Sequence, residues 1–441
     1  MHKAVKGISL AGLNVVMLTE SHINRDARIQ KEACSLANAG ANTTVVACDK
    51  EYPVELSRNA PYKIILPEVL LPPNPPPLPR LGQQDVWLPL RCAINKTFTR
   101  LREDRYKKEL AQYHGRNALH ESDPVLITIN ASGIDAETSY YIGMIDAVKG
   151  CKVDVVHAHD LGTLYTGYRL AQMTGALLLY DTHELFLEMH TISDEAKSVL
   201  SIVEETIFPK LNALISVSPF IVERLMNQYE HSGIKPVVLY NGGSKIASSL
   251  SDTTQPIKLF FQGAFSPSRN LEGLIESVQG LRGLVTLTLQ GWGHDYEDKL
   301  RALIENLGIG DFVEIIPPCL PLETVDSAAS YDLGIINSIA LDDNFLTTLP
   351  NKLFDYMCAG LAIASTDLPS IKSIIDEEGC GITFEQGSVD VTAKALADLA
   401  SNPKKVHEMK EASLRAAPKY AWPAQGEKLV SLYAELMQEI S

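Results

Sequence analysis

The chain has 441 residues, of which 45% are hydrophobic and 21% are charged, and its formal net charge is −15. This length supports two or three domains with complete cores, and the strongly negative charge argues against nucleic acid as a general partner. Seven cysteines without a Cys-x-x-Cys pair favour reduced thiols, and no apolar run reaches the length of a membrane span. We therefore expect a soluble, cytoplasmic protein.

The N-terminal region has the pattern of a parallel α/β sheet. A β-rich run at 13–18 is followed by a loop and by a helix expected at 25–39, which Gly40 ends. A second β-rich run at 43–48 completes a strand–helix–strand unit. The dinucleotide fingerprint Gly-x-Gly-x-x-Gly is absent from the first turn.

The loop after the first strand and the start of the helix carry polar residues, among them Ser21, Asp26 and Arg28. Ligands bind parallel sheets at the carboxyl ends of the strands, so this loop is well placed to contact a substrate. Asp26 is equally suited to cap the helix, with Arg28 on the surface. The residues alone leave both interpretations open.

Residues 51–125 interrupt this rhythm. The Pro-rich stretch 71–79 excludes a regular helix or a central strand. The stretch 91–109 is rich in Arg and Lys and has apolar residues on one helical face. Such a helix can lie peripherally on the inner face of an anionic membrane, or it can receive an anionic acceptor. A solvated helix on an insertion is the interpretation that we favour.

Two later strands each end in a histidine and an acidic residue. The first ends in His159-Asp160 and the second in His183-Glu184. The carboxyl ends of parallel strands share one edge of the sheet, so these side chains predict a site at that edge. A His-x-His pattern with carboxylates is also compatible with zinc. His157, in the interior of the first strand, is more typical of a core residue.

Three further elements are expected in the first half of the chain. A helix is predicted at 193–208, a strand at 213–218, and a last strand with its exit loop at 237–243, which contains Asn241. The polar segment 244–256 then has the composition of a linker between domains.

The second half predicts a second parallel sheet. Gly291 lies in a Gly-x-Gly turn after one of its strands, where a small residue lets a ligand or a helix approach closely. The expected strands are 257–261, 285–290, 312–316 and 332–336.

A long loop is expected at 337–349, after the last of these strands. Its residues Thr347 and Thr348 offer hydroxyl and amide groups to a phosphate or a sugar. A helix expected at 425–440 closes the chain.

The stretch 349–360 is the most informative part of the sequence. Pro350 presets the backbone for the first turn of a helix, apolar residues then fall on one face, and Gly360 ends it. The free N–H groups and positive dipole of a helix start suit a diphosphate. Asp355, about one turn after Lys352, can accept two hydrogen bonds from a vicinal diol such as a nucleotide ribose. An amphipathic helix with a solvated Lys and Asp explains the pattern alone equally well.

The stretch 350–360, Pro-Asn-Lys-Leu-Phe-Asp-Tyr-Met-Cys-Ala-Gly, resembles the donor-binding motif of one branch of the retaining glycosyltransferases of family 4. The resemblance covers nearly the whole chain and implies the GT-B fold, two Rossmann-like α/β domains that face a central cleft. It implies an acceptor-side domain at 1–243, the linker at 244–256, a nucleotide-sugar-binding domain at 257–420, and a helix at 421–441 that crosses back to the first domain.

The resemblance also implies which residues hold the donor. The family's ribose-binding acid is usually Glu, where this chain has Asp355. Of two cations that hold the diphosphate, the Arg is replaced by Ala264 and the Lys by Arg269. The expected catalytic residues are His183, Arg269 and Lys352. The expected donor-binding residues are Asp355, Asn351, Thr347, Thr348, Gly263, Gly291 and Pro317.

The implied reaction moves a sugar from a nucleotide sugar to an acceptor hydroxyl with retained configuration, in the biosynthesis of a glycan, glycolipid or glycoconjugate. It needs neither a metal nor a cofactor, and a UDP-sugar is favoured over a GDP-sugar as donor. The acceptor, a glycan, a lipid-linked sugar or a small molecule, stays open. The expected acceptor-side and cleft residues are Ser21, Asp26, Arg28, His159, Asp160, Glu184 and Asn241.

Two other classes of protein stay open. A nucleotide-sugar epimerase shares the fold, but the Pro-Asn-Lys helix is not its signature. A non-catalytic nucleotide-sugar-binding or partner subunit is favoured by Ala264, Thr347 and Asp355, which depart from the common family pattern.

Overall fold

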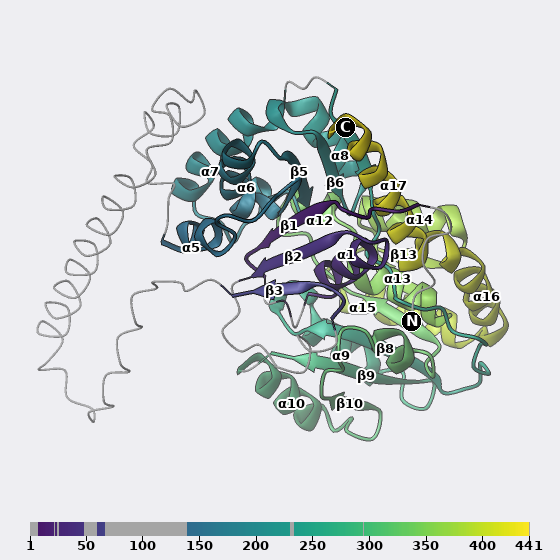
Figure 1. The fold of residues 1–441 in the computed structure, drawn as a ribbon. Coiled ribbons are helices and arrows are strands. Elements are labelled where there is room, and N and C mark those ends of the chain that lie inside the picture. Colours follow the sequence, from purple (N-terminus) through teal and green to yellow (C-terminus); the bar gives the residue numbers. More distant parts are fainter. Residues whose placement is uncertain are drawn as a thin grey trace, which may run out of the picture.

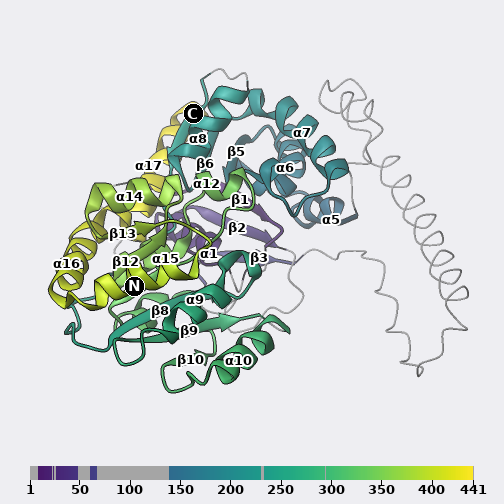
Figure 2. The same ribbon diagram turned by 180° about the vertical axis from the view of Figure 1, so that it is seen from behind.

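The computed structural model describes residues 8–21, 23, 26–47, 60–66, 139–229, 233–293 and 295–440. Their fold is drawn in Figure 1 and, from behind, in Figure 2. The predicted Pro-rich stretch and the predicted basic helix at 91–109 lie outside the described residues. Among the helices of the described residues, none is long and apolar enough to cross a membrane.

The first half forms a parallel sheet whose seven described strands are in the order β3-β2-β1-β4-β5-β6-β7. Adjacent residues of its central strands point into two different cores, as in a sheet covered on both faces. The strands are β1 (Asn14–Thr19), β2 (Asn42–Ala47), β3 (Lys63–Ile65), β4 (Val155–His159), β5 (Leu177–Thr182), β6 (Ala213–Ser216) and β7 (Lys235–Val238). The helices are α1 (Ala27–Asn38), α5 (Ser139–Ala147), α6 (Asp160–Thr174), α7 (Asp194–Ile207) and α8 (Pro219–Gln228), with short 3-10 turns η2 (Phe186–Glu188) and η3 (Phe208–Lys210).

The second half forms a parallel sheet of six strands in the order β10-β9-β8-β11-β12-β13. The strands are β8 (Ile257–Ala264), β9 (Val285–Trp292), β10 (Val313–Ile316), β11 (Leu333–Ile336), β12 (Ala362–Thr366) and β13 (Gly381–Phe384). The helices are α9 (Leu271–Gln279), α10 (Asp295–Leu307), α11 (Thr324–Ala328), α12 (Asp343–Thr347), α13 (Asn351–Ala359), α14 (Pro369–Glu378), α15 (Val389–Ala400), α16 (Pro403–Tyr420) and α17 (Trp422–Ile440), with the 3-10 turn η4 (Pro267–Arg269).

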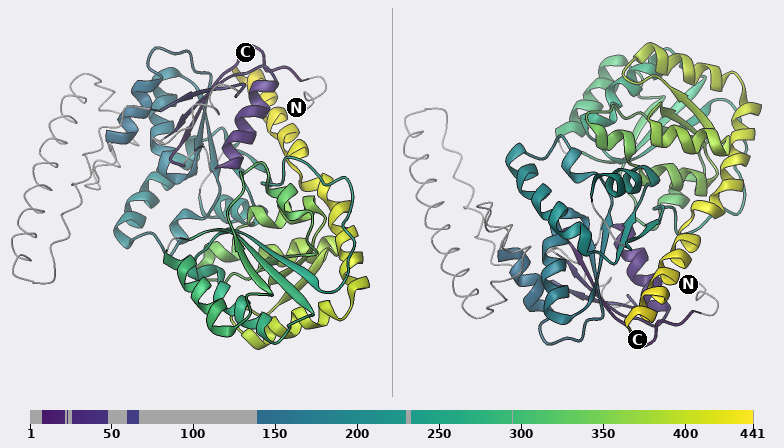
Figure 3. Two further views of the ribbon diagram at one scale, coloured as in Figure 1. Left: turned by 90° about the horizontal axis from the view of Figure 1, so that it is seen from below. Right: turned by 90° about the horizontal axis from the view of Figure 1, so that it is seen from above.

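Helix α17 joins the two halves of the molecule. It follows α16, which covers the second sheet, and runs along α1 of the first sheet (Figure 3). Its buried side chains Leu429, Tyr433 and Leu436 belong to the same core as Val15 and Met17 of β1. The last helix of the chain therefore completes one face of the first sheet.

Close packing holds α13 against the second sheet. Gly334 of β11 lies under the ring of Tyr356, where a Cβ atom would come within 2.2 Å of a ring carbon. The Tyr356 hydroxyl accepts a hydrogen bond of 3.0 Å from the backbone N–H of Gln262 on β8. This contact fixes the register of the motif helix against two strands.

The predicted α/β class with two Rossmann-like sheets is confirmed. The predicted strand and exit loop at 237–243 correspond to the end of β7 and the loop that follows Val238. Two local predictions were wrong. The stretch 337–349 is not a continuous loop, since Asp342 caps the short helix α12 within it. Pro350 precedes the first turn of α13, with extended backbone at ψ 141°. The predicted domain boundaries stay a prediction.

Candidate functional site

A cavity of about 790 Å³ opens where the carboxyl edges of the two sheets face each other. This is the position expected for ligands of open parallel sheets. From the first half of the chain it is lined by Ser21, Asp26, Arg28, Lys31, His183, Glu184, His190 and Asn241, among others. From the second half it is lined by Gly263, Ala264, Arg269, Gly291, Trp292, Ser338, Asn344, Thr348, Asn351, Lys352 and Asp355, among others.

Two cationic side chains, Arg269 and Lys352, lie close together on the second-sheet side of the cavity. Arg269 ends the turn η4 and donates a hydrogen bond of 3.2 Å to the Ser338 hydroxyl. The Lys352 Nζ lies 3.9 Å from the centre of the Phe261 ring. Burial, together with the charge of Arg269, holds the pKa of Lys352 well below its usual value. Neither cation forms an ion pair with a described carboxylate, so this pair is suited to bind an anion.

Glycines give a ligand access to these cations. Gly263 has φ +135°, and a Cβ atom there would lie 3.3 Å from the Lys352 Nζ. A Cβ atom on Gly291 would lie 1.9 Å from the Gly263 carbonyl oxygen. Side chains at either position would therefore disturb the turn that borders the cation pair.

The start of α13 adds backbone donors to this region. No side chain caps the helix at Pro350, and both Asn351 and Thr348 line the cavity. Asp355, one turn further along, is only 8% exposed. Burial raises the pKa of Asp355 to about 6, against the opposing effects of the Lys31 charge and a hydrogen bond with Thr324.

Lys31 is a cleft residue that the sequence analysis missed. Its Nζ donates hydrogen bonds to Asn241 Oδ1 at 2.5 Å and to the Gly242 carbonyl at 2.8 Å. Burial lowers its pKa to about 8, against the attraction of Asp355. The available signal was position, because Lys31 lies one helical turn after Arg28 on the same helix.

His183 lies between two carboxylates at the end of β5. Its Nδ1 is 3.2 Å from Asp160 Oδ2, and its Nε2 is 3.6 Å from Asp181 Oδ2. Burial opposes the charged form, but Asp160 and Asp181 together raise the pKa of His183 well above its usual value. The backbone N–H of His183 also donates to Asp160 Oδ1. The two carboxylates therefore fix the orientation of the His183 ring and favour its charged form.

A buried cluster of charged side chains, which includes Arg28, Glu32 and Asp181, lies next to this histidine. Arg28 donates to both carboxylate oxygens of Asp181 and lies 2.9 Å from Glu32 Oε1. The His157 Nδ1 and the hydroxyl of Tyr433 on α17 share a hydrogen bond of 2.9 Å. The surface position considered for Arg28 was wrong, because its side chain is only 1% exposed. Asp26 does cap α1, through hydrogen bonds from two backbone N–H groups.

The same cluster contains the His-x-His pattern that is compatible with zinc. Oxygen or nitrogen atoms of Glu32, His157, His159 and Asp181 lie within 4.8 Å of one another. The Arg28 guanidinium already lies against both carboxylates and supplies the cation that they require. We therefore interpret the cluster as an ion-pair network.

Segment 342–347, which contains α12, crosses to the first half of the chain. Asn344 donates to Glu184 Oε2 at 2.8 Å and accepts from the Leu185 N–H at 2.9 Å. Asp342 Oδ2 accepts from both the backbone N–H and Nδ1 of His190, at 2.7 and 2.6 Å. The sequence analysis missed these contacts, because it had no helix here to direct the side chains.

Four residues expected at the cleft do not line the cavity. Pro317 is exposed at the end of β10, and the next residues of that loop reach the cavity instead. The Thr347 hydroxyl bonds back to carbonyls of its own helix. His159 is buried, and Asp160 contacts His183, which itself lines the cavity.

Two parallel Rossmann-like sheets with a cleft between their carboxyl edges define the GT-B class of fold. Residues 244–415 match the family model described as "Glycosyl transferases group 1". This segment of the chain is therefore similar to the group 1 glycosyl transferases.

Similar solved structures extend over the whole chain. Sucrose-phosphate synthase from Thermosynechococcus elongatus superposes with a TM-score of 0.69 at 12% identity, over 97% of this chain and 100% of that one. Anabaena HepE in complex with UDP-glucose superposes with a TM-score of 0.63 at 14% identity, over 96% and 100%. These likenesses establish the fold.

A curated relative is similar over a shorter region. D-inositol 3-phosphate glycosyltransferase from Thermobispora bispora is 22% identical over 142 residues, which are 32% of this chain and 32% of that protein. The chain thus matches about a third of this relative's length.

Proposed function

We propose that this glycosyltransferase moves a sugar from a UDP-sugar to an acceptor hydroxyl with retention of configuration. The observation that supports this most directly is the unpaired cation pair of Arg269 and Lys352 beside the uncapped start of α13. A diphosphate needs this combination of charge and backbone donors. UDP is favoured over GDP because the solved Anabaena protein binds UDP and UDP-glucose.

In the proposed mechanism, the donor diphosphate lies on Arg269, Lys352 and the N–H groups of α13. These groups stabilise the negative charge that develops as the bond to the sugar breaks. Asp355 accepts hydrogen bonds from the ribose hydroxyls. The reaction needs no metal, because the two side-chain cations and the helix start supply the positive charge.

The transferred sugar lies between the diphosphate site and the first sheet. The His183 imidazolium contacts it near the anomeric carbon, and the acceptor approaches from the side of Ser21, Asp26 and Glu184. Attack on the face from which the diphosphate leaves retains the configuration. The acceptor belongs to glycan, glycolipid or glycoconjugate biosynthesis.

One observation favours a second candidate, a nucleotide-sugar-binding subunit without catalytic activity. Ala264 lines the cavity where the family pattern has a cation, so the diphosphate is held by one charge fewer. A weaker diphosphate site stabilises the leaving group less.

Binding and turnover together separate the two candidates. Thermal unfolding is measured with UDP, GDP, ADP and their common sugar conjugates, since a ligand of the folded state raises the melting temperature. We expect a selective shift with UDP and a UDP-sugar, followed by slow release of UDP from that donor in water. Binding without any release of UDP, with or without an acceptor panel, favours the subunit. The absence of any shift contradicts the proposed donor site.

A further inference from the structure

Segment 342–347 belongs to the second half of the molecule. The Ser370 hydroxyl on α14 donates to the Thr348 carbonyl at 2.7 Å, directly after α12. The residues that follow lead into α13, which carries the proposed diphosphate site. Any movement of α12 is therefore transmitted over three residues to the start of α13. Figures 1 and 2 both place α12 beside the first sheet.

The contacts of this segment are made across the cleft. Asn344, which is 4% exposed, uses both ends of its side-chain amide on the residues that follow His183. Asp342 binds the backbone and the ring of His190. The Thr347 carbonyl accepts from the Ser218 hydroxyl at 2.5 Å. All five hydrogen bonds join one short segment of the second half to three places in the first.

Asn344 also sets the surroundings of Glu184. Burial and the Asp160 charge raise the pKa of this carboxyl, whereas Asn344, His183 and Arg269 lower it. Separation of the two halves would remove Asn344 and Arg269 together, since both belong to the second half. A carboxylate directed at the cleft is therefore stabilised by groups that reach it only when the cleft is closed.

We propose that segment 342–347 is a clasp and that Asn344 is a positioning residue, which fixes Glu184 on the acceptor side only when the two halves are closed. The clasp couples the start of α13 to the loop after β5. The acceptor role of this loop rests on the proposed function, whereas the clasp itself does not. The five hydrogen bonds of the clasp stabilise the closed form in the absence of a ligand.

The first test compares Asn344→Ala with Asp343→Asn in the full-length protein. Asp343 is an exposed residue of the same helix, and within the part of the chain that the structure describes no hydrogen bond or ion pair joins its side chain to the first half. Small-angle X-ray scattering measures the radius of gyration, and calorimetry measures the affinity for UDP. We expect Asn344→Ala to have a larger radius of gyration and a roughly tenfold weaker affinity for UDP than Asp343→Asn. Identical radii of gyration in the two variants would overturn the clasp.

The second test uses Asn344→Asp, which keeps an acceptor for the Leu185 N–H but opposes Glu184 with a second carboxyl group. At a pH too low for both carboxyl groups to ionise, the two groups share one proton and the cleft stays closed. Above it, the two charges repel and the cleft opens. The wild type and Asn344→Asp share the other charged groups near Glu184, which are Asp160, His183 and Arg269. We expect the radius of gyration to rise with pH in Asn344→Asp only.

A radius of gyration that is independent of pH in Asn344→Asp would overturn the assignment of Glu184 as the partner. Thermal unfolding of each variant without ligand shows that it is folded. Failure of every variant and of the wild type to bind UDP would contradict the proposed donor, while the scattering comparison would still decide the clasp.

Discussion

Several side chains in the cleft have pKa values that differ from those of the same groups in water. Lys31, His183, Lys352 and Asp355 all have perturbed pKa values, and burial acts on each of them. Perturbed groups gathered in one cavity are typical of functional sites. Burial of these groups is expected to lower the free energy of unfolding, and substitution of such a group can raise it.

Asp355 illustrates this conflict. Its pKa of about 6 lies above the ordinary value near 4, so between these pH values the folded protein holds a proton that the unfolded chain releases. Stability therefore falls as pH rises through this window. We expect Asp355→Asn to raise the free energy of unfolding at pH 7 by up to about 3 kcal/mol, measured by urea titration. The gain should vanish below pH 4, and a loss of stability at pH 7 would contradict the raised pKa.

The same substitution is expected to weaken donor binding. The proposed ribose contact needs the ionised carboxylate, so wild-type affinity for UDP should fall as pH drops from 7 to 5. The ratio of wild-type to Asp355→Asn affinity cancels the titration of the UDP phosphate itself. A ratio that does not change with pH would remove Asp355 from the site.

Arg269 is expected to carry much of the diphosphate affinity. Hydrogen bonds to charged groups contribute about 1.5–3 kcal/mol, so Arg269→Ala should weaken UDP binding by roughly tenfold to a hundredfold. Calorimetry measures this directly. The control is Arg282→Ala, since Arg282 of the same half donates to the Leu307 carbonyl at the surface. Equal affinities in both variants would reject the cation pair.

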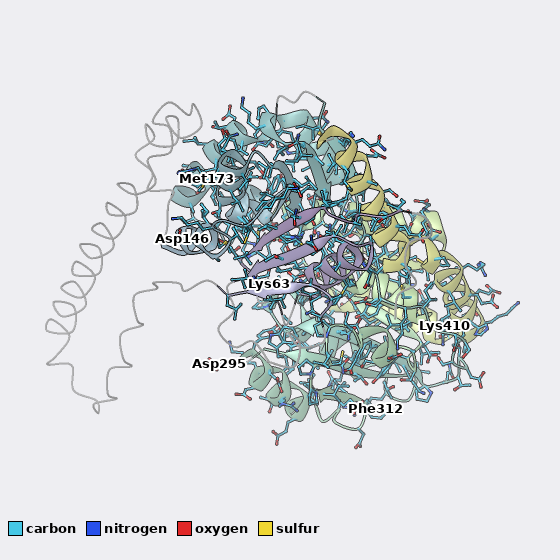
Figure 4. The ribbon with its side chains drawn as sticks, in the orientation of Figure 1. Lys63, Asp146, Met173, Asp295, Phe312 and Lys410 are labelled. Carbon is cyan, nitrogen blue, oxygen red and sulfur yellow. The ribbon has the colours of Figure 1, made fainter. Side chains whose placement is uncertain are left out.

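At the level of elements, buried polar contacts fasten irregular segments to the sheets. The Lys410 Nζ on α16, labelled in Figure 4, donates to Asp332 Oδ1 at 2.9 Å and to the Ser251 carbonyl at 3.0 Å. The Asp332 side chain is 2% exposed and also accepts from the Lys258 N–H. These contacts hold the segment between the two sheets against the second one.

We expect Lys410→Met to lower the free energy of unfolding by about 3–5 kcal/mol, because it leaves a buried carboxylate without its cation. Urea denaturation measures the loss. Lys394→Met is the matched control, since the Lys394–Asp398 pair on α15 is exposed and should contribute little. Comparable effects of the two substitutions would show that burial does not set the strength of the Lys410 pair.

The elements also show what could be predicted from the sequence. The strands β1, β5, β8 and β9 and the motif helix α13 were expected, because continuous apolar runs and a proline-to-glycine interval mark them locally. The short helix α12 was missed although Asp342 caps it locally, because its contacts with Glu184 and His190 depend on residues more than a hundred positions away. Arg28 was ambiguous for the same reason, since its partner Asp181 lies on another strand.

At the scale of the whole molecule, α17 makes the two halves interdependent. Leu429 and Leu436 are fully buried in the core of the first sheet, while α16, directly before α17, packs on the second sheet. Unfolding of either half therefore disturbs the packing of the other half. We expect the wild-type protein to unfold in a single thermal transition.

Leu429→Ala and Leu436→Ala should each destabilise the first half by about 2–5 kcal/mol. We expect the double variant to unfold in two transitions, of which UDP raises only the upper one, because the proposed diphosphate site lies on the second sheet. Differential scanning calorimetry resolves the transitions, with the exposed substitution Glu427→Gln as control. A single transition in the double variant would show that α17 does not couple the halves.

The contact between Gly334 and Tyr356 has an evolutionary consequence. A side chain at position 334 would occupy the space of the Tyr356 ring, and a smaller residue at 356 would leave the Gln262 N–H without its acceptor. Neither position can drift alone without cost, so the two should change together or not at all in divergent lineages. The motif helix would then retain its aromatic residue for a reason unrelated to the donor. Retention of Tyr356, next to Asp355, would then reflect how the helix packs and not which sugar is transferred.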